Sequence, residues 1–290
     1  MSNTPEVTLQ ALQNQANRLE SPCGDGVMIW HRWESQPEQN SQPPLVLLHG
    51  GFGSWTHWVR AIPVLRNQFT IIAADIPGLG DSSDAPMPHT PGGLADIIAT
   101  GLNSILPASQ PFHLAGFSFG GMLGSVVASL QGKRCLTFTA VGASGFGDLH
   151  YIVKGIRLPE PGMTETEINE LHRDNLKVLM FNDPASADDL AIHVHRSNVS
   201  RARVRSRRLS VSSALVDALP SISAKIGGIW GELDVTGGGI EKINARADMF
   251  RDIQPGARFD VIEDAGHWVM YEAAAVFSET LIQHLQMGDT

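Results

Sequence analysis

The sequence predicts an α/β protein with a doubly wound, mostly parallel sheet. Three observations predict it. Six short runs are apolar on both faces, which is typical of parallel strands covered by helices. Helical patterns separate the runs, and strand–helix alternation of this kind favours an open sheet. The chain of 290 residues is long enough to bury one large core. The six runs are Pro44–His49, Thr70–Asp75, Phe112–Gly116, Leu136–Val141, Lys225–Trp230 and Arg258–Ile262.

An antiparallel hairpin is predicted ahead of these runs, and helices are predicted between and after them. The hairpin spans Asn14–Glu34, with Gly24–Gly26 as its turn. The Asn- and Gln-rich residues at the N-terminus and the segment Glu34–Pro43 are expected to be loop or frayed. Apolar residues recur at helical spacing in five segments. These segments are Thr56–Leu65, Pro91–Leu106, Gly120–Gln131, Ile240–Arg251 and Tyr271–Gln286.

One long stretch breaks the alternation of strands and helices. From Phe146 to Ser221 the pattern is helical and contains no strand signal. Ser186, which is followed closely by two aspartates, is typical of a helix N-terminus, because serine caps free N–H groups and acids are favourable in the first turn. The sequence therefore predicts one domain, residues 1–290, with a helical lid inserted at residues 146–221.

Composition and charge limit the partners of the chain. Its formal net charge is −9, with 30 acidic and 21 basic residues. A chain this acidic is a poor general ligand for nucleic acid or an anionic membrane, so a small-molecule substrate is expected. Two cysteines, Cys23 and Cys135, make no disulfide framework, and the sequence shows no secretory signal and no uninterrupted apolar span. The expected compartment is the cytoplasm, and the oligomeric state stays open.

A G-x-S-x-G motif stands where a predicted strand meets a predicted helix. It reads GFSFG over Gly116–Gly120. A serine on so tight a turn needs glycines beside it, because larger side chains would collide there. The turn holds the Ser118 hydroxyl above the carboxyl edge of the sheet, and the N-terminus of the next helix faces developing negative charge. Ser118 is therefore the predicted nucleophile.

A base and an orienting acid are predicted to activate this serine, because a serine hydroxyl is a weak nucleophile near neutral pH. His267 follows the last predicted strand, in the sequence DAGHW. Asp234 ends the loop after the preceding strand, in WGELD, and is preferred to Glu232 as the acid. The order Ser118, Asp234, His267 is the one expected for a nucleophile on an α/β sheet.

Two backbone N–H donors are expected around the oxyanion of a tetrahedral intermediate. One belongs to Phe119, the residue after the nucleophile. The other is expected from the loop His49–Gly53, with Gly51 as the first choice and Phe52 as the second, because glycine lets the backbone approach a substrate closely. His49 itself is expected to brace this loop.

Substrate contacts are predicted from aromatic residues near the motifs and from the lid. Phe52, Phe117 and Trp268 suit a mostly apolar pocket, with core packing as the alternative. Arg196 and Arg201 are the candidates for a bidentate contact with a substrate carboxylate, with a solvated face paired to acids as the alternative. They belong to a run of six arginines: Arg196, Arg201, Arg203, Arg205, Arg207 and Arg208.

Neither a metal ion nor another cofactor is expected. His193 and His195 are two residues apart and diverge on a helix, and no further ligands stand at useful spacing. Within the arginine run, Arg201, Arg205 and Arg208 are expected to share one helix face.

Taken together, the motifs resemble those of serine-dependent members of the α/β-hydrolase superfamily that carry a lid. The resemblance runs from about Gly26 to Leu285 and implies the α/β-hydrolase fold. His267 followed by Trp268, and the HGG loop, are similar to those of the meta-cleavage-product hydrolases. Those enzymes cut carbon–carbon bonds in vinylogous 1,5-diketones from aromatic degradation. The matching stretches are LLHGGFG, DIPGLGDS, GFSFGG, WGELD and DAGHW.

The resemblance leaves several activities open. Meta-cleavage-product hydrolases often carry a polar residue before the nucleophile, where this chain has Phe117, so ester hydrolysis stands beside C–C cleavage. Haloperoxidase-like and perhydrolase members also keep a serine triad. Epoxide hydrolases and haloalkane dehalogenases are excluded, because they use an aspartate where this chain has Ser118. A non-catalytic binding or sensor protein on the same fold is the alternative from another class.

Overall fold

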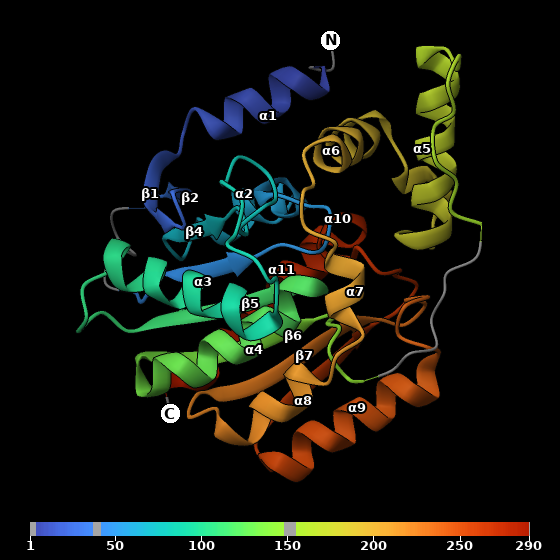
Figure 1. The fold of residues 1–290 in the computed structure, drawn as a ribbon. Coiled ribbons are helices and arrows are strands. Elements are labelled where there is room, and N and C mark those ends of the chain that lie inside the picture. Colours follow the sequence, from blue (N-terminus) through green and yellow to red (C-terminus); the bar gives the residue numbers. More distant parts are fainter. Residues whose placement is uncertain (1–3, 37–41, 148–154, 290) are drawn as a thin grey trace.

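The computed structural model describes residues 4–36, 42–147 and 155–289, and its centre is an eight-stranded mixed sheet (Figure 1). The strand order is β1-β2-β4-β3-β5-β6-β7-β8. β1 pairs antiparallel with β2, and β2 with β4, whereas every later pair is parallel. The predicted doubly wound, mostly parallel sheet is therefore confirmed. The strands are β1 Asn17–Cys23, β2 Gly26–Trp33, β3 Leu45–Leu48, β4 Ile71–Ala74, β5 Phe112–Phe117, β6 Cys135–Val141, β7 Lys225–Gly231 and β8 Arg258–Ile262.

The α-helices cover both faces of this sheet (Figure 1). Side chains on β3 alternate between two cores: Val46 and Leu48 pack with α3, α4, α8 and α9, whereas Leu45 and Leu47 pack with α2 and α11. Strands that are buried on both faces explain why the sequence shows continuous apolar runs. The α-helices are α1 Pro5–Gln13, α2 Ile62–Leu65, α3 Pro91–Ile105, α4 Phe119–Gln131, α5 Glu165–Leu179, α6 Asp189–Ser200, α7 Ser206–Ser210, α8 Ala214–Ala218, α9 Ile240–Ile253, α10 Val269–Glu272 and α11 Ala274–Leu285.

Two segments predicted as single helices are broken in the structure. The first gives a 3₁₀ turn, Trp55–Trp58, followed by the short α2, and the last gives α10 and α11. Tertiary packing decides both breaks, because the apolar residues on either side of each break are buried in the same core. The other 3₁₀ turns within the described residues are Gly132–Arg134, Pro184–Ser186, Leu219–Ser221 and Gln286–Asp289.

The N-terminal segment was expected to form a loop, and that expectation is wrong, because it contains α1. The Thr4 side chain accepts a hydrogen bond from Val7 N, and Pro5 occupies the first turn, where its missing N–H costs nothing. The Trp33 indole of β2 donates to the Leu12 carbonyl at 2.8 Å and ties the helix to the sheet. This tertiary contact has no local sequence signal.

Residues 142–224 join β6 to β7 and contain α5 to α8; we call them the β6–β7 insertion. In Figure 1, α5 and α6 lie beyond one edge of the sheet, while α7 and α8 run back past α4. The predicted lid, residues 146–221, falls within this insertion, and its residues 148–154 lie outside the described part of the chain. The cap of α6 is Asp188, which accepts from Ala191 N, rather than Ser186.

The arginine run does not form one helix face, so this expectation is also wrong. Helix α6 ends at Ser200 and α7 begins at Ser206, and the residues between them form turns, bends and irregular chain. The backbone N–H of Arg203 donates to the carbonyl of Gly78 at 2.9 Å, which draws the chain out of the helix and onto the loop after β4.

Among the described residues, no helix has the length and hydropathy to cross a membrane.

Candidate active site

The nucleophile candidate sits on a strained turn between β5 and α4. Ser118 has φ 51° and ψ −115°, a region that L-residues rarely adopt. The turn is packed so tightly that a Cβ on Gly120 would lie 2.3 Å from the His49 carbonyl oxygen, and one on Gly116 would lie 2.3 Å from the Gly120 oxygen. The Ser118 side chain remains half-buried, so a substrate has access to it. The glycines of the motif are thus required by backbone contacts.

Hydrogen bonds from the end of β6 hold this turn in place. Ser118 N donates to the Val141 carbonyl at 2.9 Å, and Ser144 N donates to the Ser118 carbonyl at 3.1 Å. Phe119 is the first residue of α4, and N–H groups in the first turn of a helix have no partner within the helix. The helix therefore orients the Phe119 N–H but provides no hydrogen-bond acceptor for it.

Asp234 and His267 form a buried hydrogen-bonded pair at the ends of β7 and β8. His267 Nδ1 lies 2.9 Å from Asp234 Oδ2 and 3.0 Å from Thr236 Oγ1. Thr236 Oγ1 donates to the other carboxylate oxygen, Oδ1, at 2.8 Å. Because an ionised carboxylate only accepts, Nδ1 carries the proton and Nε2 keeps a lone pair. The arrangement leaves His267 ready to accept a proton at Nε2.

The charge of Asp234 is stabilised in spite of its burial. Burial works against the ionised carboxylate, but the His267 ring and the hydrogen bonds from Thr236 outweigh it and hold the pKa of Asp234 below its usual range. The Gly237 N–H adds a further hydrogen bond to Oδ1 at 3.2 Å. A carboxylate that stays charged near neutral pH can orient the imidazole and stabilise it when it becomes protonated.

Close packing brings this pair to the serine turn. Gly142, which follows Val141 and has φ +48°, would carry a Cβ only 3.2 Å from both Asp234 Oδ2 and His267 Nδ1. The Phe117 ring, next to the serine, lies 4.8 Å from the His267 ring between centroids. The Asp234–His267 pair therefore lies beside the residue before Ser118, at the carboxyl edge of the sheet. Ligand sites in open α/β sheets form at this edge.

The loop after β3 is held by two buried histidines. His49 Nδ1 lies 2.7 Å from the Gly50 carbonyl oxygen and its Nε2 accepts from Ile76 N at 2.9 Å, so the expectation that His49 braces the loop is confirmed. His57 Nδ1 accepts from Gly50 N at 3.2 Å. Burial lowers the pKa of His49 to about 4, and its neutral ring suits both hydrogen bonds.

Gly51 and Phe52, the two candidates for the second oxyanion donor, differ in their surroundings. A Cβ on Gly51 would lie 2.5 Å from Ser206 Oγ and 3.8 Å from the Cβ of Phe119. Gly51 thus stands close to the first residue of α4 and beneath the β6–β7 insertion. Phe52 has φ 52° and is 42 % exposed. The surroundings of Gly51 favour it as the donor, and Phe52 offers an exposed aromatic ring beside it.

Phe117 and Trp268 are packed into the core. Phe117 is fully buried between the rings of His57 and His267. Trp268 donates from Nε1 to the His57 carbonyl at 2.8 Å and stacks on Phe181 with centroids 5.5 Å apart. These contacts agree with core packing, the alternative given for these residues. Both side chains support the histidines of the site.

Arg196 and Arg201 have partners within the chain. Arg196 donates to Asn169 at 2.7 Å and pairs with Glu165 at 2.8 Å. Arg201 pairs with Asp81 at 2.5 Å and also donates to the Asn198 side chain. A substrate carboxylate would have to displace these groups. The contacts agree with the alternative of a face paired to acids.

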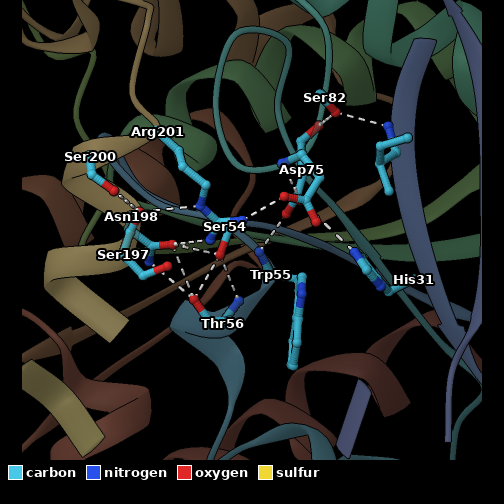
Figure 2. Close-up of polar contacts among 12 residues, drawn as sticks. His31, Ser54, Trp55, Thr56, Asp75, Ser82, Ser197, Asn198, Ser200 and Arg201 are labelled. Carbon is cyan, nitrogen blue, oxygen red and sulfur yellow. Dashed lines mark hydrogen bonds and ion pairs between the residues drawn. The ribbon is translucent and has the colours of Figure 1, made fainter. Parts of the chain in front are cut away.

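A second buried polar cluster lies where α6 meets the body of the protein (Figure 2). Asn198 of α6 accepts from Ser54 Oγ at 2.7 Å and donates to Thr56 Oγ1 at 3.0 Å. Both partners lie in the turn after the His49–Gly53 loop. The cluster therefore fixes the insertion against the element that carries the oxyanion candidates.

One group in this cluster has the composition of a metal site. His31, Asp75 and Asp81 place ligand atoms within 4.8 Å of one another. However, an Asp75 oxygen accepts from Trp55 N at 2.8 Å (Figure 2). The other Asp75 oxygen accepts from Asp81 N at 2.9 Å, and Arg201 pairs with Asp81. Because these carboxylates already serve backbone N–H groups and a guanidinium, the donor set fits a structural tie rather than a metal centre.

The sequence did not single out three residues that the structure brings to the site. Thr236 bridges the acid and the base, His57 holds Gly50, and Ser206 lies over Gly51. Thr236 has a signal in the sequence, since a hydroxyl two residues after an aspartate often bonds back to it. His57 and Ser206 have none, because their partners are distant in the chain or belong to the backbone.

Comparison with known proteins identifies the family of the chain. Residues 45–280 match the family described as "Alpha/beta hydrolase family". A dihydrolipoyllysine-residue acetyltransferase component of the acetoin cleaving system from Pseudomonas putida is 28 % identical over 84 % of this chain. The match spans 63 % of that relative, so the chain corresponds to less than two thirds of its length.

Two further comparisons bear on the fold. A 2-hydroxy-6-oxo-6-phenylhexa-2,4-dienoate hydrolase from Comamonas testosteroni is 25 % identical, over 83 % of this chain and 87 % of that protein. A thermophilic esterase from Thermogutta terrifontis has a similar structure, with a TM-score of 0.65 and 19 % identity over 95 % of this chain and 100 % of that one. The matches confirm the predicted α/β-hydrolase fold.

Proposed function

Because the chain belongs to the alpha/beta hydrolase family, we propose that it is a serine hydrolase that cleaves carboxylic esters. The nucleophile is Ser118, the base is His267 and the orienting acid is Asp234. One observation carries this proposal: the buried Asp234–His267 pair, 2.9 Å between Oδ2 and Nδ1, lies against Phe117, the residue before a serine on a strained turn. A serine with only a structural role would not require a strained backbone or a neighbouring Asp–His pair.

The first half of the reaction forms an acyl-enzyme. Ser118 Oγ attacks the carbonyl carbon while its proton moves to His267 Nε2, and the carbonyl electron pair moves onto oxygen. Asp234 stabilises the imidazolium that results. The tetrahedral intermediate then collapses, and the C–O bond to the leaving group breaks. The alkoxide that leaves takes its proton from His267 Nε2.

The second half returns the enzyme to its starting state. A water molecule gives a proton to His267 Nε2 and attacks the acyl carbon. The new intermediate collapses, Ser118 Oγ leaves and takes this proton, and a carboxylic acid is released. In both halves the N–H groups of Gly51 and Phe119 stabilise the oxyanion. Each such donor typically contributes about 3–4 kcal/mol to transition-state stabilisation.

The β6–β7 insertion is the lid of this enzyme. It meets the oxyanion loop at Gly51 through Ser206, and it is fixed to the turn after that loop through Asn198. A lid in this place excludes water from the reacting carbonyl and covers the apolar side of the cleft at Phe52.

Hydrolysis of a C–C bond is the second candidate. The relative from Comamonas testosteroni, named as a 2-hydroxy-6-oxo-6-phenylhexa-2,4-dienoate hydrolase, aligns along 83 % of this chain. The same serine and histidine would serve that reaction, with a carbon leaving group that takes up the proton. Meta-cleavage-product hydrolases often carry a polar residue before the nucleophile. This chain has the apolar Phe117 there, which favours ester hydrolysis.

A covalent probe and two substrates test the proposal. A fluorophosphonate should label wild-type protein at Ser118, and p-nitrophenyl acetate should be hydrolysed. Ser118→Ala should abolish both, whereas Ser129→Ala, a control in the same helix with a hydroxyl bonded to Val126 O, should keep both. Turnover of 2-hydroxy-6-oxo-6-phenylhexa-2,4-dienoate in preference to the ester would favour the second candidate. Absence of labelling at Ser118 would overturn the assignment of the nucleophile.

A further inference from the structure

The Ser206 side chain lies directly over the loop assigned to the oxyanion hole. Ser206 begins α7 in the β6–β7 insertion and is only 1 % exposed. A Cβ on Gly51 would stand 2.5 Å from Ser206 Oγ and 3.8 Å from the Cβ of Phe119. The hydroxyl therefore occupies space that only glycine leaves free at position 51. Three elements meet here: the loop after β3, the first turn of α4 and the insertion.

The Ser206 hydroxyl differs from most buried serine hydroxyls of the chain. Within the described residues Ser206 Oγ makes no hydrogen bond, although buried polar groups are almost always paired. Unlike Thr139 Oγ1, which is unpaired and fully enclosed, Ser206 Oγ keeps a small accessible surface. By contrast, Ser54 Oγ donates to Asn198 at 2.7 Å, and Ser125 Oγ donates to Met122 O at 2.7 Å. A buried hydroxyl with no partner of its own can donate to a group that arrives with the substrate.

A set of specific contacts holds Ser206 in this position. The preceding residues run along the loop after β4, where Arg203 N donates to the Gly78 carbonyl at 2.9 Å. The Arg203 side chain pairs with Asp84. Val204 is 2 % exposed, and a Cβ on Gly78 would stand 2.3 Å from its Cγ2. We call the segment Arg201–Ser206 the strap.

The strap accounts for two members of the arginine run, Arg201 and Arg203. Arg201 pairs with Asp81 at 2.5 Å, and Arg203 pairs with Asp84. These two arginines fasten the strap to the body of the protein at the start of the segment that ends with Ser206. These arginines therefore affect the candidate site only indirectly, because they help to position the Ser206 hydroxyl.

We propose that Ser206 is a further catalytic residue, which donates its hydroxyl hydrogen to the substrate carbonyl oxygen as the oxyanion forms. This inference rests on the proposed function, because it uses the same oxyanion hole. The body of the protein supplies two backbone donors, from Gly51 and Phe119, and the insertion supplies the third. The oxyanion hole is complete only when the strap is docked.

The first test separates a catalytic hydroxyl from a structural one. Ser206→Ala should lower kcat for p-nitrophenyl acetate by about 10- to 150-fold, the range for a hydrogen bond to a charged group, and should change KM by less than about threefold. Ser210→Ala, in the same helix, should leave both constants unchanged, because the Ser210 contact to Gly145 N uses its backbone oxygen. The melting temperature of each variant is measured alongside.

The second test uses an inhibitor that imitates the tetrahedral intermediate. Phenylboronic acid forms a tetrahedral adduct with an active serine, whereas benzoate resembles a planar product. Ser206→Ala should weaken phenylboronic acid by a factor close to the loss in kcat and should leave benzoate inhibition unchanged. If Ser206→Ala does not fold, Ser206→Cys keeps the shape with a weaker donor and should show the same pattern.

Each outcome decides the inference. Wild-type kcat and wild-type boronate affinity in a folded Ser206 variant would overturn it. So would equal losses for boronate and benzoate, because these indicate a role in folding or docking. Both results leave the proposed function intact, provided that the fluorophosphonate labels wild-type Ser118. Failure of that labelling would overturn the proposed function, and this inference with it.

Discussion

The carboxyl edge of the sheet and the β6–β7 insertion hold their residues by different physical means. At the sheet edge, backbone groups touch one another so closely that Gly116 and Gly120 have no room for a Cβ. The insertion instead meets the body through side-chain pairs: Arg60 with Asp188, Arg201 with Asp81, and Arg203 with Asp84. The first kind of contact is rigid and local. The second kind is charged, partly exposed and sensitive to salt.

The two kinds of contact suit the sheet edge and the β6–β7 insertion to different roles in the proposed enzyme. Exposed ion pairs contribute only about 0–1 kcal/mol each, so the insertion is held mainly by its buried contacts, such as Asn198 with Ser54. Chemistry that needs a strained serine belongs on the rigid edge, since strain persists only where the surroundings enforce it. Substrate entry needs an element that can move.

The largest effects are expected at the sheet edge. Ser118→Ala and His267→Ala should each lower kcat by about 10⁴- to 10⁶-fold, because the two residues act as one unit. For the same reason the double variant should lose no more than either single variant. Steady-state and single-turnover kinetics on p-nitrophenyl acetate measure this. Multiplicative losses in the double variant would contradict a shared role.

The acid and its bridging threonine should rank next. Asp234→Asn should lower kcat by about 10⁴-fold, because it favours the wrong tautomer of His267. Thr236→Val, which removes the hydroxyl bonded to Asp234 Oδ1, should lower kcat by about 10- to 150-fold. Loss of this hydrogen bond should raise the pKa of Asp234, so the acidic limb of the pH–rate profile should move to higher pH. A Thr236→Val variant with wild-type activity would show that the threonine is dispensable.

The loop after β3 should make stability depend on pH. Burial lowers the pKa of His49 from 6.5 to about 4, so the folded protein prefers the neutral ring. Between these values the unfolded chain binds more protons than the folded one, so stability falls as pH falls from 6.5 towards 4. The loss is about 3 kcal/mol. Urea unfolding between pH 7 and 4 measures it.

A variant isolates the contribution of His49 from that of other groups. His49→Gln keeps a donor and an acceptor but has no proton to gain, so its unfolding free energy should fall less steeply over the same pH range. Identical slopes in the variant and the wild type would assign the pH dependence elsewhere.

The smallest effect is expected at Arg196, in the insertion. Its guanidinium pairs with Glu165, which is largely exposed, and donates to Asn169. Arg196→Ala should therefore change unfolding free energy by about 1 kcal/mol or less and kcat/KM by less than about twofold. The comparison uses a neutral and an anionic ester of equal size. A loss of 10-fold or more that is confined to the anionic ester would instead support a carboxylate contact by this arginine.

The sheet and the strained serine turn could be predicted from the sequence. All six predicted parallel strands are present, because residues buried on both faces leave a continuous apolar run. The motif GFSFG predicted the strained serine for a similar reason. The glycines that such a turn requires lie within the same five residues, so the constraint is local and readable.

Tertiary structure alone decided how the insertion meets the sheet. Nothing near Ser206 in the chain indicates that its hydroxyl faces Gly51, 155 positions earlier, or that Arg203 pairs with Asp84. Likewise, α1 is tied to the sheet by the indole of Trp33 on the Leu12 carbonyl. Hydrophobic periodicity and local turn chemistry report on neighbours in sequence. Contacts between distant side chains depend on how the elements pack, and that information appears only once the chain is folded.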